Sequence, residues 1–164
     1  MIRSPQIMET IKSITHSRVY KNDKTGKVIV AHRGTQGAQD VFTDISYGVG
    51  ITNNSRFEHA KKIQKQAEAK YGKESIVTVG HSLGGLIAND VTDKASKQIT
   101  YNKPTIFNSH NKNELAIKTS NDPFSLNTNN ENKRKVVIDN GGMSLNARAN
   151  HSVDHIEKLG NVFL

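Results

Sequence analysis

The chain has 164 residues and a formal net charge of +8, from 23 basic and 15 acidic side chains, and it contains no cysteine. This length predicts a single domain spanning residues 1–164, with room for a buried core. Without cysteine, disulfides, a thiol nucleophile and a cysteine-based metal site are excluded. Residues 1–15 contain no continuous apolar run, so neither a signal peptide nor a membrane span is visible, and we expect a cytoplasmic protein.

The excess of positive charge has two interpretations. It can attract an anionic surface, either nucleic acid or phospholipid head groups, or it can reflect a lysine-rich, solvated surface. The lysines are scattered, and the only dense basic run is 133–135. No basic patch is interleaved with aromatic residues, which disfavours nucleic acid as a partner. We therefore favour a solvated surface and leave open a weak contact with an anionic membrane surface.

Strands and helices are expected to alternate along the chain, which predicts an α/β fold with a mostly parallel sheet. Residues 19–20 and 27–32 are expected to form a hairpin around the turn-rich segment 22–26. A helix with one apolar face is predicted over 56–71, and Gly72 suits its end.

A second strand–helix unit is predicted from a β-branched run at 75–79 and the helical spacing of Leu83, Ile87, Val91 and Ala95, which predicts a helix over 83–97. Toward the C-terminus we expect strands at 105–107, 114–119 and 135–139, an exposed asparagine-rich loop at 127–132, and a short helix at 153–159.

The most informative motif joins that strand and helix: Gly80-His81-Ser82-Leu83-Gly84-Gly85 contains G-x-S-x-G. A serine at such a sharp turn is held in a strained backbone with its hydroxyl accessible, while the glycines allow strand and helix to approach. The N–H groups of the helix N-terminus point at the place where negative charge would develop. The pattern could also be a glycine-rich turn that contains serine by chance. With the flanking strand and helix, it predicts that Ser82 is a nucleophile.

A nucleophilic serine needs a base, and in this kind of fold the partners follow in the order serine, acid, histidine. Of the seven histidines, only His151 and His155 lie late in the chain. We favour His151, because a junction between a loop and a helix gives an imidazole better reach. His155, one helical turn later, is the alternative.

For the acid, Asp122 directly follows a predicted strand and precedes Pro123, which prevents the strand from continuing. Catalytic groups gather at the carboxyl ends of strands in open α/β sheets. Asp139 also ends a predicted strand and is the alternative. An Asx turn before proline would explain Asp122 without catalysis, but the nearby serine motif favours a catalytic role.

The segments 30–35 and 43–45, the serine motif, Asn121-Asp122-Pro123 and a late histidine together resemble the class 3 (fungal-type) lipases, over most of the chain from Val28 to His151. The resemblance implies an α/β-hydrolase-like fold, with a mostly parallel central sheet flanked by helices. It implies that Ser82, Asp122 and His151 are the nucleophile, acid and base. The oxyanion hole falls on Thr35 and the backbone N–H of Leu83, and Asp44 matches a structural aspartate.

The chain departs from this family in ways that bear on its substrate. The segment between Ile45 and Arg56 is too short for the usual lid helix, and the N-terminal region is trimmed. Aromatic residues make up only 5% of the chain and tryptophan is absent, which argues against a broad apolar surface for docking on lipid droplets. We therefore expect hydrolysis of dispersed esters, with a short or absent lid.

Together these observations predict a lipase or esterase that cleaves carboxylic esters of acyl lipids through an acyl-enzyme. Its partner would be a small-molecule or lipid ester, and neither a metal nor an organic cofactor is needed. An acyltransferase with the same triad is one alternative. A non-catalytic module that binds membrane surfaces on a hydrolase fold is another.

Overall fold

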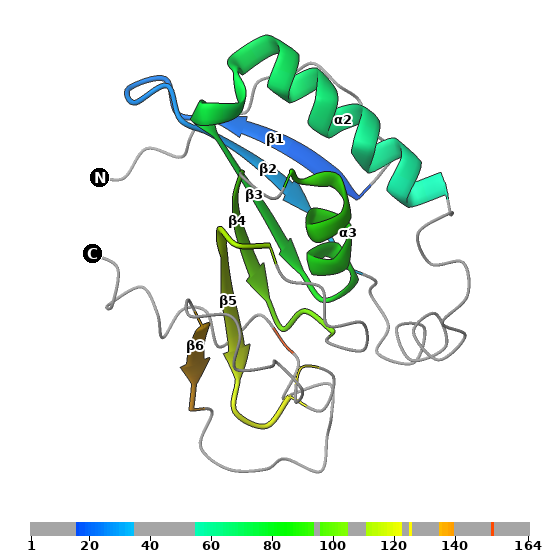
Figure 1. The fold of residues 1–164 in the computed structure, drawn as a ribbon, viewed down its shortest axis with the longest axis vertical. Coiled ribbons are helices and arrows are strands. Elements are labelled where there is room, and N and C mark those ends of the chain that lie inside the picture. The colour runs from blue at the N-terminus through cyan, green and yellow to red at the C-terminus, as the bar shows by residue number, and fades with distance from the viewer. Residues whose placement is uncertain are drawn as a thin grey trace.

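The computed structural model describes residues 16–34, 55–93, 96–104, 111–122, 125, 135–139 and 152. Its centre is a six-stranded sheet in which the strands lie side by side in chain order, from β1 to β6 (Figure 1). The strands are β1 (Ser17–Lys21), β2 (Val28–His32), β3 (Ile76–His81), β4 (Lys97–Tyr101), β5 (Glu114–Thr119) and β6 (Lys135–Ile138). Only the β1–β2 pair is antiparallel, and the other four pairs are parallel. This arrangement confirms the predicted α/β class and its mostly parallel sheet.

The β1–β2 hairpin forms because its turn supplies its own hydrogen bonds. The Asn22 Oδ1 accepts hydrogen bonds from the N–H groups of Lys24 and Thr25, at 3.0 and 3.2 Å. Gly26 takes a φ of 69°, which residues with a side chain rarely adopt. The turn sets the register in which Val19 faces Val30, and the predicted hairpin is confirmed.

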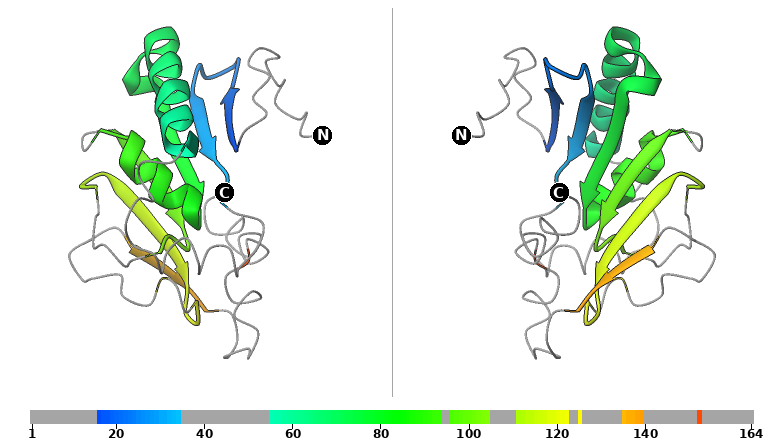
Figure 2. Two further views of the ribbon diagram at one scale, coloured as in Figure 1. Left: turned by 90° about the vertical axis from the view of Figure 1, so that its right-hand side faces the viewer. Right: turned by 90° about the vertical axis from the view of Figure 1, so that its left-hand side faces the viewer.

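Both long helices, α2 (Ser55–Tyr71) and α3 (Leu83–Val91), cover the same face of the sheet (Figures 1 and 2). Right-handed crossovers between neighbouring parallel strands carry successive helices to one side. A short 3-10 turn, η2 (Lys73–Ser75), joins α2 to β3. Two apolar clusters hold the layers together: Val28, Val30, Ile63, Ala67 and Ile76 between α2 and the sheet, and Phe57, Ala60, Leu83 and Ile87 between the helices.

The half of the sheet formed by β4, β5 and β6 has an apolar and a polar face. Tyr101, Ile117 and Ile138 form a third buried cluster on one face. Because side chains alternate along a strand, the neighbouring positions Thr100 and Glu114 lie on the other face, toward α3, and both are buried. The polar face is therefore part of the interior.

The predicted helix over 83–97 is wrong in its C-terminal part. α3 ends at Val91, and Lys97 is the first residue of β4. The Thr92 hydroxyl donates to the Ala88 carbonyl oxygen, and Thr92 itself has an extended backbone with ψ of 133°. A strand at β4 was not predicted because two of its buried positions, Gln98 and Thr100, are polar.

The helix predicted over 56–71 and the strands predicted at 75–79, 114–119 and 135–139 are confirmed to within two residues at each end. The expected strand at 105–107, loop at 127–132 and helix at 153–159 lie outside the described residues. Within the described part of the chain, no helix is both long and apolar enough to cross a membrane.

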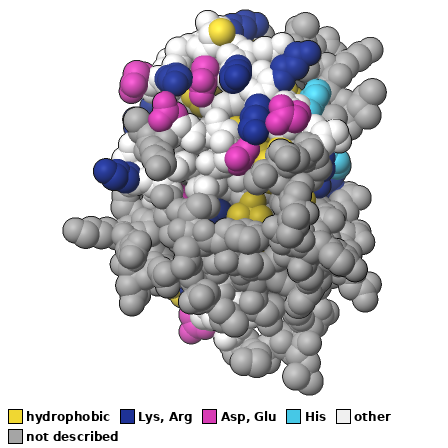
Figure 3. Space-filling model, turned by 45° about the vertical axis from the view of Figure 1, so that its right-hand side comes forward, with side chains coloured by type: hydrophobic (Ala, Val, Ile, Leu, Met, Phe, Trp, Pro, Cys, Tyr) yellow, Lys and Arg dark blue, Asp and Glu magenta, His cyan; other side chains and the backbone are white. Residues whose placement is uncertain are grey.

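Basic and acidic side chains are interspersed over α2 and its surroundings (Figure 3). Lys61 lies 3.2 Å from a carboxylate oxygen of Glu58 and 3.4 Å from one of Asp90. Lys73 and Asp93 form another exposed pair at 3.3 Å. Mixed charges of this kind fit the predicted solvated surface over this part of the molecule.

Candidate active site

Ser82 is the single residue between the end of β3 and the start of α3. Its backbone has φ of 55° and ψ of −129°, a region that residues with a side chain rarely occupy. Its N–H donates to the Tyr101 carbonyl oxygen at 3.0 Å, and its own carbonyl oxygen accepts from the Gly85 N–H at 2.8 Å. The turn is therefore fixed from both sides in the strained conformation that is typical of the nucleophile in strand–turn–helix motifs.

Two glycines of the motif are required by close backbone contacts. A Cβ atom at Gly80 would lie 2.1 Å from the Gly84 carbonyl oxygen, and one at Gly84 would lie 2.1 Å from the His32 carbonyl oxygen. Neither contact is possible between real atoms, and backbone cannot move aside as a flexible side chain can. The glycines thus let α3 pack directly against the ends of β2 and β3.

The Ser82 side chain is buried, and its hydroxyl oxygen has no hydrogen-bond partner among the described residues. Buried hydroxyls normally have a partner, so this one calls for an explanation. Leu83, the next residue, is the first of α3. The first N–H groups of a helix have no acceptor within it, which leaves the Leu83 N–H beside the hydroxyl without an intrahelical partner.

The loop after β2 reaches the same turn. A Cβ atom at Gly34 would lie 2.7 Å from the His81 carbonyl oxygen and 3.1 Å from the Ser82 Cβ. Gly34 is therefore in contact with the turn, and Thr35 is the next residue in the chain. Thr35 and Asp44 lie outside the described residues, as does most of the short segment 46–55.

The two candidate acids differ in burial. Asp122 is 0% exposed and lies three residues after the end of β5, where its N–H donates to the Thr119 carbonyl oxygen at 3.4 Å. Because β3, β4 and β5 are parallel, their carboxyl ends share one edge of the sheet. Ser82 and Asp122 thus lie at the same edge with only β4 between them. Asp139, which follows the outermost strand β6, is exposed.

Asn102 links these strand ends, a role that the sequence analysis missed. It follows β4 with φ of 44°, and its N–H donates to the Ile117 carbonyl oxygen at 2.9 Å. The Asn102 Oδ1 accepts the Thr119 N–H at 2.8 Å. Asparagine tolerates this backbone better than most residues, so Asn102 fixes the end of β5 from which the Asp122 loop leaves.

The C-terminal segment meets this edge of the sheet at one described residue, Ser152. The Tyr101 hydroxyl donates to the Ser152 carbonyl oxygen at 3.2 Å, and the backbone of Tyr101 holds the Ser82 N–H. His151 immediately precedes Ser152 in the chain. Both candidate bases, His151 and His155, lie outside the described residues.

A buried ion pair supports α3 from the polar face of the sheet. The Lys103 Nζ lies 2.8 Å from a Glu114 carboxylate oxygen, with side chains only 4% and 0% exposed. The Lys103 Nζ also donates to the Asn89 Oδ1 of α3 at 3.4 Å, and the Thr100 hydroxyl donates to Glu114. Burial lowers the pKa of Lys103, and the Glu114 carboxylate opposes this shift. Within the described part of the chain, no cluster of His, Asp and Glu is arranged to hold a metal ion.

His32, which lies under the turn, should make the free energy of unfolding depend on pH. It is 3% exposed, its Nδ1 lies 2.8 Å from the Ser17 hydroxyl, and burial lowers its pKa from 6.5 to about 4. At a pH between those two values, the His32 imidazole is protonated in the unfolded chain and neutral in the folded chain. The contribution of neutral His32 to the free energy of unfolding is therefore complete above pH 6.5 and is lost as the pH falls toward 4. The loss amounts to about 3 kcal/mol.

Urea unfolding of the wild type and His32→Asn across that range measures this effect. Asparagine can keep the hydrogen bond to Ser17 but has no proton to gain. The stability advantage of the wild type over His32→Asn should shrink as the pH is lowered. A constant difference between the two proteins would show that the His32 pKa is not depressed.

The chain is similar to known proteins at the level of a family and of solved structures. A family model described as Phospholipase-like, Tle-like phospholipase domain, matches residues 2–132. No curated protein sequence matches the chain. Solved structures with similar folds include a mutant form of MDLA from Penicillium cyclopium, with 18% identity and a TM-score of 0.47, and a fungal lipase with 16% identity and a TM-score of 0.47. Each match covers 71% of this chain and 54% of the other, so this chain spans about half the length of those proteins.

Proposed function

Because the chain belongs to the family of Tle-like phospholipase domains, we propose that it is a serine hydrolase that cleaves carboxylic esters of phospholipids, with Ser82 as the nucleophile. The observation that carries the proposal is the backbone conformation of Ser82 together with the burial of its hydroxyl. Its φ is 55°, and its hydroxyl is buried without a partner among the described residues. A serine that serves only the fold normally has a hydrogen-bond partner, whereas a nucleophile must keep its hydroxyl available for the base and the substrate.

The proposed reaction has two steps. In the first, the Ser82 Oγ attacks the ester carbonyl carbon while its proton passes to His151. The N–H groups of Leu83 and Thr35 stabilise the negative charge on the carbonyl oxygen. The bond to the alcohol then breaks, and His151 returns the proton to the leaving alcohol. In the second step, His151 takes a proton from water, which attacks the carbonyl carbon of the acyl-enzyme. The bond to the Ser82 Oγ then breaks, His151 returns the proton to that oxygen, and the fatty acid is released.

Burial supports Asp122 as the acid that orients the base. Asp122 is 0% exposed at the edge of the sheet that also carries Ser82, whereas Asp139 is exposed beside β6. A carboxylate shielded from water interacts more strongly with an imidazolium than a solvated one does. Asn102, through its hydrogen bond to Thr119 at 2.8 Å, would keep Asp122 at a fixed distance from the turn.

The contact between Tyr101 and Ser152 supports His151 as the base. The Tyr101 hydroxyl holds the Ser152 carbonyl oxygen at 3.2 Å, and the Tyr101 backbone holds Ser82. Ser152, which directly follows His151 in the chain, is thereby tied to the strand next to the nucleophile. His155 is three residues farther along the chain from this contact.

Four substitutions test the assignment through release of fatty acid from a short-chain phospholipid. We expect Asp122→Asn and His151→Ala each to lower kcat by about 10⁴-fold, because the residues of a triad act as a unit. The matched controls Asp139→Asn and His155→Ala should have little effect. If Asp139→Asn or His155→Ala is the more damaging member of its pair, that residue takes over the role.

A further inference from the structure

The last residue of β4, Tyr101, contacts two segments of the candidate active site. Its carbonyl oxygen accepts the Ser82 N–H at 3.0 Å, and its hydroxyl donates to the Ser152 carbonyl oxygen at 3.2 Å. The Tyr101 ring lies 5.6 Å from the ring of His81, its cross-strand neighbour in β3 and the residue before Ser82. Tyr101 is buried. One buried tyrosine therefore joins the nucleophile turn to the segment that follows His151.

The next residue, Asn102, holds a third segment. Its Oδ1 accepts hydrogen bonds from the N–H and the hydroxyl of Thr119, at 2.8 and 3.4 Å. Thr119 ends β5, and its own carbonyl oxygen accepts the Asp122 N–H at 3.4 Å. Asn102 and Thr119 are both fully buried, so water cannot replace these hydrogen bonds. The loop that carries Asp122 thus begins at a point that Asn102 fixes.

Asparagine is less favourable to the fold at this position than glycine would be. Asn102 has φ of 44°, which glycine adopts more readily than any residue with a side chain. The Asn102 Nδ2 is buried and makes no hydrogen bond within the part of the chain that the structure describes, and a buried donor without a partner is destabilising. What asparagine adds is the acceptor for Thr119, at the strand end between Ser82 and Asp122.

We propose that Tyr101 and Asn102 are positioning residues of the triad, which hold the segments of the nucleophile, the acid and the base together at one edge of the sheet. The inference rests on the proposed function and extends it to residues that act through others. The Tyr101 hydroxyl acts on the base through Ser152, and the Asn102 amide acts on the acid through Thr119. Catalysis is sensitive to such placement, because a displacement of about 1 Å can cost about 10²-fold in rate.

Two matched pairs of variants test the proposal. Tyr101→Phe removes the hydroxyl and keeps the ring, and Tyr20→Phe makes the same change in β1. Asn102→Gly removes the acceptor for Thr119 and permits the φ of 44°. Asn22→Gly removes the side-chain acceptor of the hairpin turn. Each pair therefore makes one chemical change at two places in the fold.

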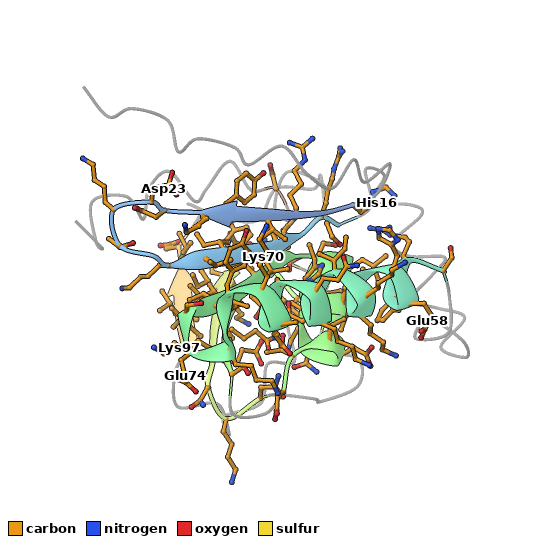
Figure 4. The ribbon with its side chains drawn as sticks, turned by 90° about the horizontal axis from the view of Figure 1, so that it is seen from above. His16, Asp23, Glu58, Lys70, Glu74 and Lys97 are labelled. Carbon is orange, nitrogen blue, oxygen red and sulfur yellow. The ribbon has the colours of Figure 1, made fainter. Side chains whose placement is uncertain are left out.

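The two control residues lie at the opposite end of the sheet from the candidate active site. Figure 4 shows Asp23 of the hairpin turn at the same end of the sheet as Lys97, the first residue of β4. Tyr20 lies in β1 next to this turn, and Asn22 belongs to it. Because β4 ends at Tyr101, changes at the controls leave the strand ends at the site intact.

We expect Tyr101→Phe and Asn102→Gly each to lower kcat for a p-nitrophenyl ester by about tenfold, the effect of one lost hydrogen bond. KM should stay unchanged, because neither residue binds the substrate. Tyr20→Phe and Asn22→Gly should keep the kcat of the wild type. Urea unfolding of each variant measures stability separately. Since Tyr101→Phe removes a single atom, it tests the proposal even where Asn102→Gly is too unstable to assay.

The same substitutions in the Ser82→Ala background separate positioning of the triad from a general structural role. Neither Tyr101→Phe nor Asn102→Gly should change the residual rate there, because losing one triad residue already removes the contribution of the others. A further fall in that background would overturn the proposal. Wild-type kcat in both single variants, or equal losses in the controls, would also overturn it while the proposed function stands. A wild type that hydrolyses no ester would refute the proposed function and the positioning role with it.

Discussion

Replacing Ser82 with alanine is expected to lower the turnover of a p-nitrophenyl ester by about 10⁴-fold or more. Without the Oγ no acyl-enzyme can form. The N–H groups that stabilise the oxyanion can then assist only the slow, direct attack of water on the ester. The rate is measured under saturating substrate, so that the loss is read in kcat. Turnover equal to that of the wild type would rule out Ser82 as the nucleophile.

The fold should survive this change, because the Ser82 hydroxyl has no hydrogen-bond partner among the described residues. Ser17→Ala is the matched control, since the buried Ser17 hydroxyl lies 2.8 Å from the His32 Nδ1. Losing that hydrogen bond should cost about 1 kcal/mol of unfolding free energy while kcat is kept. Ser82→Ala should show the reverse pattern, with urea unfolding unchanged and kcat lost.

The largest expected effect on stability comes from the buried pair of Lys103 and Glu114. Lys103→Met should lower the free energy of unfolding by about 3–5 kcal/mol, because it leaves the charge of Glu114 buried without its partner. The Lys103 and Glu114 side chains are only 4% and 0% exposed, so water cannot replace the lost interaction. Urea unfolding of the two proteins at neutral pH measures the difference.

The exposed pair of Lys73 and Asp93 provides the control for that experiment. Its two atoms are 3.3 Å apart, but the side chains are 53% and 55% exposed, so water and salt screen the attraction. Lys73→Met should therefore have a far smaller effect than Lys103→Met. Similar losses for both variants would show that burial does not determine the strength of the Lys103–Glu114 pair.

Most of the sheet was predictable because its signals are local. Asn22 and Gly26 mark the hairpin turn, and β-branched residues mark β3. The apolar face of α2 follows the helical period over a long segment. Each of these patterns is contained in a few consecutive residues, so no knowledge of tertiary contacts was needed.

β4 could not be predicted because its environment is set by residues far from it in the sequence. Gln98 and Thr100 are buried, yet they are polar and gave no apolar run. Thr100 donates to Glu114, 14 residues later, and this partner becomes adjacent only when β4 and β5 pair. A buried polar network is invisible to hydrophobic periodicity, and the predicted helix was therefore extended through Lys97.

Residues of the candidate site could likewise be predicted where their role depends on local sequence, and could not where it depends on a neighbouring strand. The strand, glycines and serine of the turn were recognisable because their geometry is local, and Asp122 was identified from its position after a strand. Asn102 was missed because its role depends on the neighbouring strand β5.

Labelling with a fluorophosphonate probe tests most directly whether Ser82 is an activated nucleophile, because the probe reacts with a serine only when the hydroxyl is activated by its surroundings. Peptide mapping by mass spectrometry after labelling identifies the modified residue. We predict one adduct on Ser82 in the folded wild-type protein, and none after urea unfolding or in Ser82→Ala. A folded wild-type protein that remains unlabelled, or that carries the adduct on another serine, would contradict it.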